Sequence, residues 1–234
     1  MKINKIETYG WEAAVRGMRN PLNSWGNSDS YWCKDEDNCP FSDSFWCNGF
    51  RCDEEDSCPF GECDLEEHYK LGENDLKLMK NLIKAGTDHS KFMRMIIFSC
   101  DIEAPLYWWK EMDTYKVGTV RNSCSTMHKL ASKPFEEKDF ENHYGGKILT
   151  QTIEFLNDAR EKYLKTTDDS EKQTFFEIMI KNLPSSYIQK ATWMANYAVL
   201  RNIYHSRKNH KLKEWHFFTK VIEDIPYAKE LIVD

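Results

Sequence analysis

The sequence lacks several features that would assign it to a class at once. No apolar run approaches the roughly 20 residues that a membrane-spanning helix needs, and the first residues, MKINK, lack the apolar segment of a secretory signal. Neither G-x-G-x-x-G nor a P-loop is present, and no direct nucleic-acid signature is visible. No Ser-His-Asp or Cys-His triad can be asserted from spacing. The lack of a membrane-spanning run and of a secretory signal predicts a cytoplasmic protein without a membrane segment.

The composition predicts a folded chain with an unevenly distributed charge. The 234 residues are 41% hydrophobic and 14% aromatic, which is enough for a substantial core. We expect one domain over residues 1–234, with an inserted segment at 31–67. Residues 34–67 hold twelve Asp and Glu against Lys34 and Arg51, so the remaining residues carry +4 of the total −6. A mildly basic body suits an anionic ligand such as a phosphate, unless the charge is simply scattered.

The insertion contains six of the eight cysteines: Cys33, Cys39, Cys47, Cys52, Cys58 and Cys63. Their spacing differs from the short C-x2-C pairs of zinc ribbons, and the carboxylates lack the order of a calcium loop. Disulfides would be unusual in a cytoplasmic chain. Two interpretations stay open, a structural zinc bound by these cysteines and an acidic insertion with free thiols.

The stretch from Asp101 to Lys129 predicts the wall of a binding site. It breaks at Ala104-Pro105, carries two adjacent tryptophans beside charged residues, and ends with small polar residues around Cys124. Upstream, Arg16 and Arg19 flank a turn-rich loop, where guanidinium groups can meet phosphate or remain solvated.

Periodicity and punctuation predict the elements in outline. We expect strands at 3–8 and 95–102 and a loop or lid at 131–147. We expect helices at 11–18, at 74–86 between Asn74 and Gly86, directly after Pro105, and at 148–164. Further helices are expected from a Ser170/Gln173 capping box to 183, at 185–206 and at 212–223. On the helix expected at 185–206, Asn196 and Arg207 share the apolar stripe. They therefore require polar partners, either a ligand or a neighbouring helix.

This order of elements resembles the flavin-dependent thymidylate synthase (ThyX) family. His89 stands at the family's distance before Ala104-Pro105, and Trp193, Asn196, Asn202 and Arg207 follow Leu183-Pro184 at the family's spacing. Trp215 follows one residue late. Residues 114–126, TYKVGTVRNSCST, occupy the place of the signature R-H-R-x-x-S-x-x-E-x-S-x-R. Six signature positions differ in this chain, and so does a Gln position before them: Thr114, Tyr115, Lys116, Asn122, Cys124, Thr126 and Glu111.

The resemblance implies an α+β fold with a central, mostly antiparallel sheet packed with helices and with long C-terminal helices. It also implies a homotetramer, FAD, a pyrimidine nucleotide, and folate and NADPH as co-reactants, and the departures resemble phage and prophage members. The expected cofactor-binding residues are His89, Lys116, Asn196 and Asn202. The expected substrate-binding residues are Glu111, Asn122, Ser123, Cys124, Lys190 and Arg207. The expected catalytic residues are Tyr115, Lys116 and Cys124.

Three functions follow as hypotheses. The first is a ThyX-like enzyme that uses FAD to transfer a one-carbon unit to C5 of a pyrimidine deoxynucleotide. In this hypothesis Lys116 and Arg207 face the phosphate, and Tyr115, Trp108 and Trp109 stack on the rings. The second is a flavin-free enzyme in which Lys116 or His128 activates Cys124 as nucleophile. For Cys124 itself we favour a small buried hydrophobe. The third is a phage protein that binds a nucleotide or a host protein without catalysis.

Overall fold

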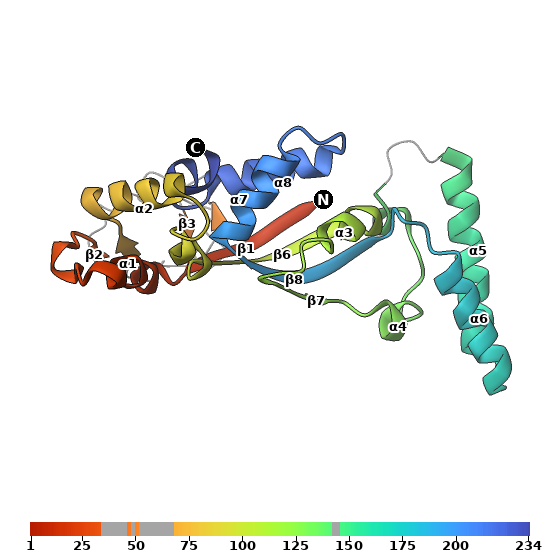
Figure 1. Ribbon diagram of the computed structural model, residues 1–234. Helices are drawn as coiled ribbons and strands as arrows, with labels where there is room; N and C mark the ends of the chain where they lie inside the picture. The colour runs from red at the N-terminus through yellow and green to blue at the C-terminus, as the bar shows by residue number, and fades with distance from the viewer. Residues whose placement is uncertain (34–45, 48–49, 52–67, 142–145) are drawn as a thin grey trace. The chain divides into compact units, whose positions relative to one another are not determined.

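A computed structural model describes residues 1–33, 46–47, 50–51, 68–141 and 146–234 (Figure 1). Four of the six predicted zinc ligands, Cys39, Cys52, Cys58 and Cys63, lie outside these residues. Only the backbone is described for Cys33 and Cys47. Among the described residues, no three His, Cys, Asp or Glu side chains gather as a metal site would require. None of their helices is long and apolar enough to cross a membrane.

A four-stranded antiparallel sheet confirms the predicted α+β class (Figure 1). Its strands stand in the order β1 (Lys2–Tyr9), β6 (Ile97–Pro105), β8 (Ile188–Asn196) and β7 (Thr119–Ser123). Two short antiparallel pairs join β2 (Tyr31–Cys33) to β5 (His68–Lys70) and β3 (Trp46–Cys47) to β4 (Phe50–Arg51). Strand β6 buries every second residue beginning at Phe98, as the period of two requires when one face covers a core.

The helices are α1 (Trp11–Arg19), α2 (Glu73–Ala85), α3 (Leu106–Met112), α4 (Thr126–Lys129), α5 (Gly146–Lys165), α6 (Asp169–Lys181), α7 (Tyr197–Arg207) and α8 (Lys213–Asp224). Short 3-10 turns cover Asn20–Leu22, Trp25–Asn27, Lys91–Arg94 and Glu137–Asp139, and a π-helical turn covers Lys229–Val233. Contacts within the chain divide it into two compact units. The first comprises residues 1–2, 102–114 and 121–192, and the second residues 3–101, 115–120 and 193–234.

The long helix expected at 185–206 is wrong in its first half, because residues 188–196 form β8. Asn196 is the N-cap of α7, and its side-chain oxygen accepts a hydrogen bond from the Val199 amide. Asn196 and Arg207 therefore do not share a helical stripe. The predicted Ser170/Gln173 capping box is also wrong, because Asp168 caps α6 by accepting from the Glu171 amide.

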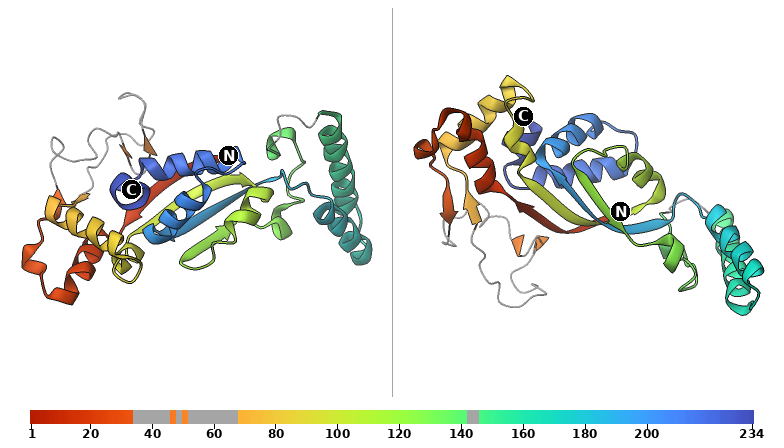
Figure 2. Two further views of the ribbon diagram at one scale, coloured as in Figure 1. Left: turned by 45° about the horizontal axis from the view of Figure 1, so that its top comes forward. Right: turned by 60° about the horizontal axis from the view of Figure 1, so that its bottom comes forward.

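In the first unit, α5 and α6 lie side by side as a helical hairpin (Figures 1 and 2). Its core gathers Leu130, Phe135, Phe140, Leu156, Ala159 and Met179. In the second unit, the core is largely aromatic. Trp193 contacts both Phe98 and Phe218 edge to face, and Trp11 contacts Tyr197 in the same way. These offset contacts suit the ring quadrupoles and add to the stabilisation from burial.

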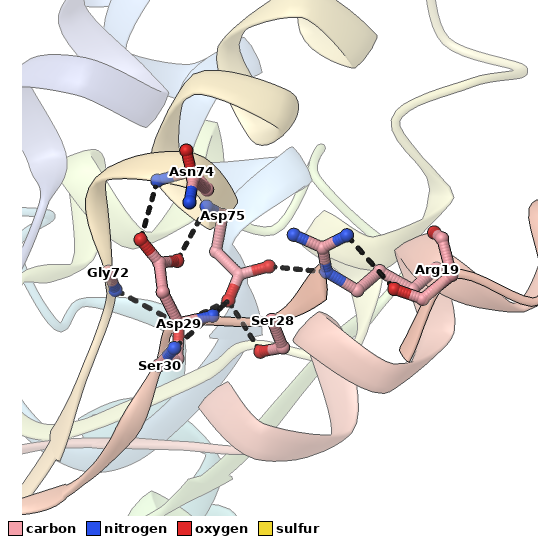
Figure 3. Close-up of polar contacts among 8 residues, drawn as sticks. Arg19, Ser28, Asp29, Ser30, Gly72, Asn74 and Asp75 are labelled. Atoms are coloured by element: carbon pink, nitrogen blue, oxygen red, sulfur yellow. Dashed lines mark hydrogen bonds and ion pairs between the residues drawn. The ribbon is translucent and has the colours of Figure 1, made fainter. Parts of the chain in front are cut away.

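In the second unit, a buried carboxylate ties the loop after α1 to the start of α2. The Asp75 side chain is fully buried, and it accepts from Arg19 Nε at 2.6 Å and from the hydroxyls of Ser28 and Ser30 at 2.6 Å each (Figure 3). The Asp29 carboxylate accepts from the amides of Asn74 and Asp75. Asp29 thus caps α2 from the loop, and the expectation that Asn74 caps this helix is wrong.

The surroundings of Asp75 determine the direction of its pKa shift. Burial alone would raise the pKa, but hydrogen bonds from Ser28, Ser30 and Arg19, together with the Arg19 charge, lower it overall. A carboxyl group whose pKa is lowered by folding stabilises the fold above its unfolded pKa of about 3.9. That stabilisation is lost as the pH falls through the folded-state pKa.

We predict that Asp75→Asn lowers the free energy of unfolding by about 3–5 kcal/mol, because it leaves the buried Arg19 guanidinium without its counter-charge. Urea unfolding at pH 7 measures this loss. In acid, the difference in the free energy of unfolding between wild type and Asp75→Asn should become smaller, because Asp75 itself becomes protonated. Asp158→Asn is the control, since it breaks only an exposed pair with Lys162 and should cost less than about 0.5 kcal/mol. An equal loss in both variants would contradict a structural role for this network.

Candidate functional site

In the second unit, Arg207 at the end of α7 is bound by two aromatic side chains. Its Nε donates to the Tyr115 hydroxyl at 2.8 Å. Its guanidinium carbon lies 4.7 Å from the centre of the Trp215 ring and 5.5 Å from the centre of the Tyr115 ring. Because aromatic faces attract cations, the two rings and the Tyr115 hydroxyl orient the guanidinium. The structure thus brings together Tyr115 and Arg207, two predicted site residues 92 positions apart.

The position of Trp215 follows from the short connection between α7 and α8. Helix α7 ends at Arg207 and α8 begins at Lys213, so Trp215 lies in the first turn of α8. Its ring is fully buried and contacts Phe218 and His210 edge to face. A ring fixed in this way is a firm platform for the Arg207 guanidinium.

The segment that carries Tyr115 rests on Asn196. Gly118 has a φ of +76°, a conformation that glycine adopts without strain. A Cβ at Gly118 would lie 2.8 Å from Asn196 Nδ2. Asn196 is only 9% exposed and is held by its cap bond to Val199, so it has little room to move. Asn196, predicted to contact a cofactor, thus caps α7 and supports the 115–118 segment.

The other predicted cofactor ligands in this unit are exposed polar residues on separate elements. His89 lies in the turn after α2, where its amide donates to the Gly86 carbonyl. Lys116 follows Tyr115, and Asn202 lies within α7. All three side chains are accessible to a ligand.

In the first unit, Cys124 follows the end of β7, and both its backbone amide and its backbone carbonyl are hydrogen-bonded to residues of β8. Its amide donates to the Lys190 carbonyl at 2.8 Å, and the Gln189 side-chain amide donates to the Cys124 carbonyl at 2.8 Å. The structure thereby brings together Cys124 and Lys190, two predicted substrate ligands. Two others, Asn122 and Ser123, are the last residues of β7.

The exposure of Cys124 corrects the interpretation that we favoured, a small buried hydrophobe. Its side chain is exposed, whereas the other cysteine with a described side chain, Cys100, is buried in β6. Burial, and to a lesser extent the Asp101 charge, raises the pKa of the Cys100 thiol and makes it unreactive. Of these two thiols, only Cys124 is accessible to a reagent or substrate.

The predicted stacking of Trp108 and Trp109 on a ligand ring is wrong. Both belong to α3, which also contains the predicted substrate ligand Glu111, and their exposed fractions are 0% and 1%. The Trp109 ring instead supports the Arg121 guanidinium, whose carbon lies 4.0 Å from the ring centre. Arg121 also donates to the Asp113 carboxylate at 2.6 Å and to the Gln189 side chain. Sequence reasoning missed Arg121 and Gln189, because no local pattern links residues 68 positions apart.

The loop after α1 does not form the predicted two-arginine phosphate site. Arg19 is buried against Asp75. Arg16 is exposed, and its Nε lies 3.9 Å from Oε1 of Glu12. An open depression of about 630 Å³ borders this loop and is lined by Arg19, Gly26, Asn27, Ser28, Asp29, Asn74 and Leu78. Because Asp75 neutralises Arg19 there, the depression offers no excess positive charge to a phosphate.

The fold is that of flavin-dependent thymidylate synthases. The structure is similar to a crystal structure of ThyX from Helicobacter pylori complexed with FAD and dUMP, with a TM-score of 0.64, 14% identity, and coverage of 99% of this chain and 98% of the other. A second structure of Helicobacter pylori ThyX with FAD and dUMP, at 2.31 Å resolution, gives the same score and identity and is covered to 97%. No protein-family model and no curated protein matches the sequence. The likeness confirms the predicted fold.

We predict that Gly118→Ala destabilises the protein more than Gly146→Ala does. Gly118 has a φ of +76° and Gly146 a φ of +45°, so alanine introduces backbone strain of about 1–2 kcal/mol at either position, and a Cβ at Gly146 would meet no atom within 4 Å. Only at Gly118 does the new methyl group also meet Asn196, which should add at least about 1 kcal/mol. Thermal unfolding measures the difference. Equal losses would show that Asn196 does not support the 115–118 segment.

Proposed function

We propose that this chain binds FAD and a pyrimidine deoxynucleotide and transfers a one-carbon unit to C5 of the base. The observation that carries this proposal is the agreement of fold, over nearly the whole of both chains, with proteins crystallised with FAD and dUMP. The arrangement around Arg207 supports it, since a planar guanidinium is well suited to a phosphate.

The described residues fit a flavin adenine dinucleotide in chemical type. His89, Lys116 and Asn202 are exposed and offer an imidazole, an ammonium and an amide to a ligand with a diphosphate and two ring systems. Asn196 would act indirectly, by fixing the start of α7 on which Asn202 lies. When bound, FAD supplies the hydride chemistry, while the protein supplies orientation and charge.

The residues proposed for the nucleotide are those that the resemblance assigns to the substrate. Arg207 and Lys116 are proposed for the phosphate, and Asn122, Ser123, Cys124, Glu111 and Lys190 for the remainder of the nucleotide. In β7, Asn122 is exposed while Arg121 and Ser123 on either side of it are partly buried, and Cys124, just beyond the strand, is exposed as well. We propose the exposed Asn122 amide and the exposed Cys124 thiol, two residues apart, as a hydrogen-bonding edge for a pyrimidine.

Other expectations stay predictions. A homotetramer and the use of folate and NADPH follow from the resemblance alone. The zinc predicted for the six cysteines concerns residues whose side chains are not described.

We predict that purified protein, or protein reconstituted with FAD, shows flavin absorption, and that dUMP raises its melting temperature. A ligand at 100 times its Kd stabilises by about 2.7 kcal/mol. Arg207→Lys should weaken dUMP binding by about tenfold or more, since lysine keeps the charge but loses the planar fork. Lys208→Ala, one residue further on and exposed, is the control. A chain that binds neither FAD nor dUMP, while remaining folded, would overturn the proposal.

The exposure of Cys124 favours a second candidate, in which its thiolate is the nucleophile of a flavin-free enzyme. Under the first proposal, Cys124→Ser should keep most activity, because serine retains the size and hydrogen-bonding capacity of the side chain. Under the second it should remove activity by at least about a thousandfold, as expected when a nucleophile is lost. Turnover of dUMP with and without FAD, in wild type and Cys124→Ser, separates the two.

A further inference from the structure

The cluster formed by Trp109, Asp113, Arg121 and Gln189 in the first unit has no part in the function proposed above. Gln189 is buried and lies on β8, while Arg121 lies on β7. In that strand Arg121 belongs to the partly buried face, opposite to the exposed Asn122 and Cys124. Arg121 can therefore affect those exposed side chains only through another group.

The chemistry of the partners determines how the Gln189 amide is oriented. Arg121 can only donate, so it must face the Gln189 side-chain oxygen. The Cys124 carbonyl can only accept, so it must face the Gln189 side-chain nitrogen. One amide thus connects a guanidinium to a backbone carbonyl, and only one orientation satisfies both contacts.

Arg121 is itself firmly placed. Its guanidinium carbon lies 4.0 Å from the centre of the buried Trp109 ring, and its Nη1 lies 2.6 Å from Oδ2 of Asp113 in an ion pair. The Trp109 indole nitrogen donates to the Gln189 backbone carbonyl at 3.0 Å, which joins the platform to β8. The Arg121 Nε is buried without a hydrogen-bond partner among the described residues. The stack and the two remaining contacts therefore outweigh the loss of one donor.

The place of Cys124 in the sheet explains why such a connection is useful. Strand β7 is at one edge of the sheet and ends at Ser123, so the Cys124 carbonyl lies just beyond the strand. Residues at the end of an edge strand ordinarily fray. Here the Cys124 amide is bound by the Lys190 carbonyl and the Cys124 carbonyl by the Gln189 side chain.

We propose that Arg121 and Gln189 are positioning residues that fix the backbone of Cys124, and with it the edge formed by Asn122 and Cys124. The identity of the ligand at this edge, a pyrimidine deoxynucleotide, rests on the function proposed above. The positioning itself does not, because every contact that carries it lies within the protein.

Gln189→Glu separates the two halves of this connection. The carboxylate still accepts from Arg121, but it cannot donate to the Cys124 carbonyl and places an oxygen against it. Without any ligand, amide exchange in a peptide covering residues 122–126 should rise by about tenfold, the loss of roughly one hydrogen bond. The rate at which an aromatic disulfide reagent modifies Cys124 should change in the same variant. Arg121→Lys, which keeps the charge but not the fork, should produce smaller changes of the same kind.

Arg160→Lys is the matched control. Arg160 lies in the same unit and also donates to a backbone carbonyl, that of Ala131, at 2.9 Å. It should leave exchange at 122–126 and the modification of Cys124 as in wild type. If Gln189→Glu and Arg121→Lys also match wild type, the proposal is overturned. It is equally overturned if their exchange rises as much along α5 and α6, because the residues would then support the unit generally.

Nucleotide binding gives the functional test. In Gln189→Glu, the Kd for dUMP should rise by about tenfold, while FAD binding should stay within about twofold of wild type. If the wild-type protein binds no dUMP, the proposed function fails, and the exchange and thiol measurements still decide the positioning role. If dUMP binds equally to wild type and Gln189→Glu although exchange has risen, the role of this edge in nucleotide binding is overturned, whereas the positioning of the Cys124 backbone is supported by the exchange result.

Discussion

The register of β8 is the constraint on which both groups of candidate site residues depend. This strand buries Gln189, Ala191, Trp193 and Ala195 on alternate positions. A slip by one residue would expose all four, because side chains alternate between the two faces of a sheet. The register therefore fixes where Gln189 and Lys190 meet Cys124. It also fixes where Asn196 ends the strand, caps α7 and supports the 115–118 segment.

Three arginines, Arg19, Arg121 and Arg207, are held in two different ways. Arg19 is buried against a carboxylate that is itself fully bonded, so its charge is neutralised and its role is structural. Arg121 and Arg207 each lie on a tryptophan ring and add directional bonds at the edge of the guanidinium. Stacking orients the plane of the guanidinium, and the Asp113 partner of Arg121 is itself half exposed rather than buried as Asp75 is. Such an arrangement suits a residue that fixes the position of another group or meets a ligand.

Amphipathic periodicity found most helices. Helices α1, α2, α5 and α8 carry apolar stripes and polar faces, and they lie within a few residues of their expected bounds. Strand β8 escaped detection because its inward positions include Gln189 and two alanines. The burial alternates, but the hydrophobicity does not. Gln, Lys, Ala and Met in the same stretch favour a helix. Pairing with β6 and β7 overrides that preference, as context commonly does in strands.

The site was predictable only where a resemblance supplied spacing. It placed Tyr115 and Arg207 in one site, and they are in contact. The connections from Arg19 to Asp75 and from Arg121 to Gln189 span 56 and 68 residues, and no local pattern reveals them. The two adjacent tryptophans were visible but misinterpreted, because a pair of large rings beside charges fits a pocket wall and a buried platform equally well. Only the fold showed that both are buried.

Several residues of segment 114–126 that differ from the family signature make specific contacts in this structure. Where the family signature has histidine, Tyr115 offers a hydroxyl that accepts from Arg207 and a ring that flanks it. Asn122 and Cys124 are two further positions that differ from the signature. At Cys124, both the backbone amide and the backbone carbonyl are hydrogen-bonded to residues of β8. The segment thus combines side chains that differ from the signature with a backbone that β8 fixes at Cys124 through the Lys190 carbonyl and the Gln189 side chain.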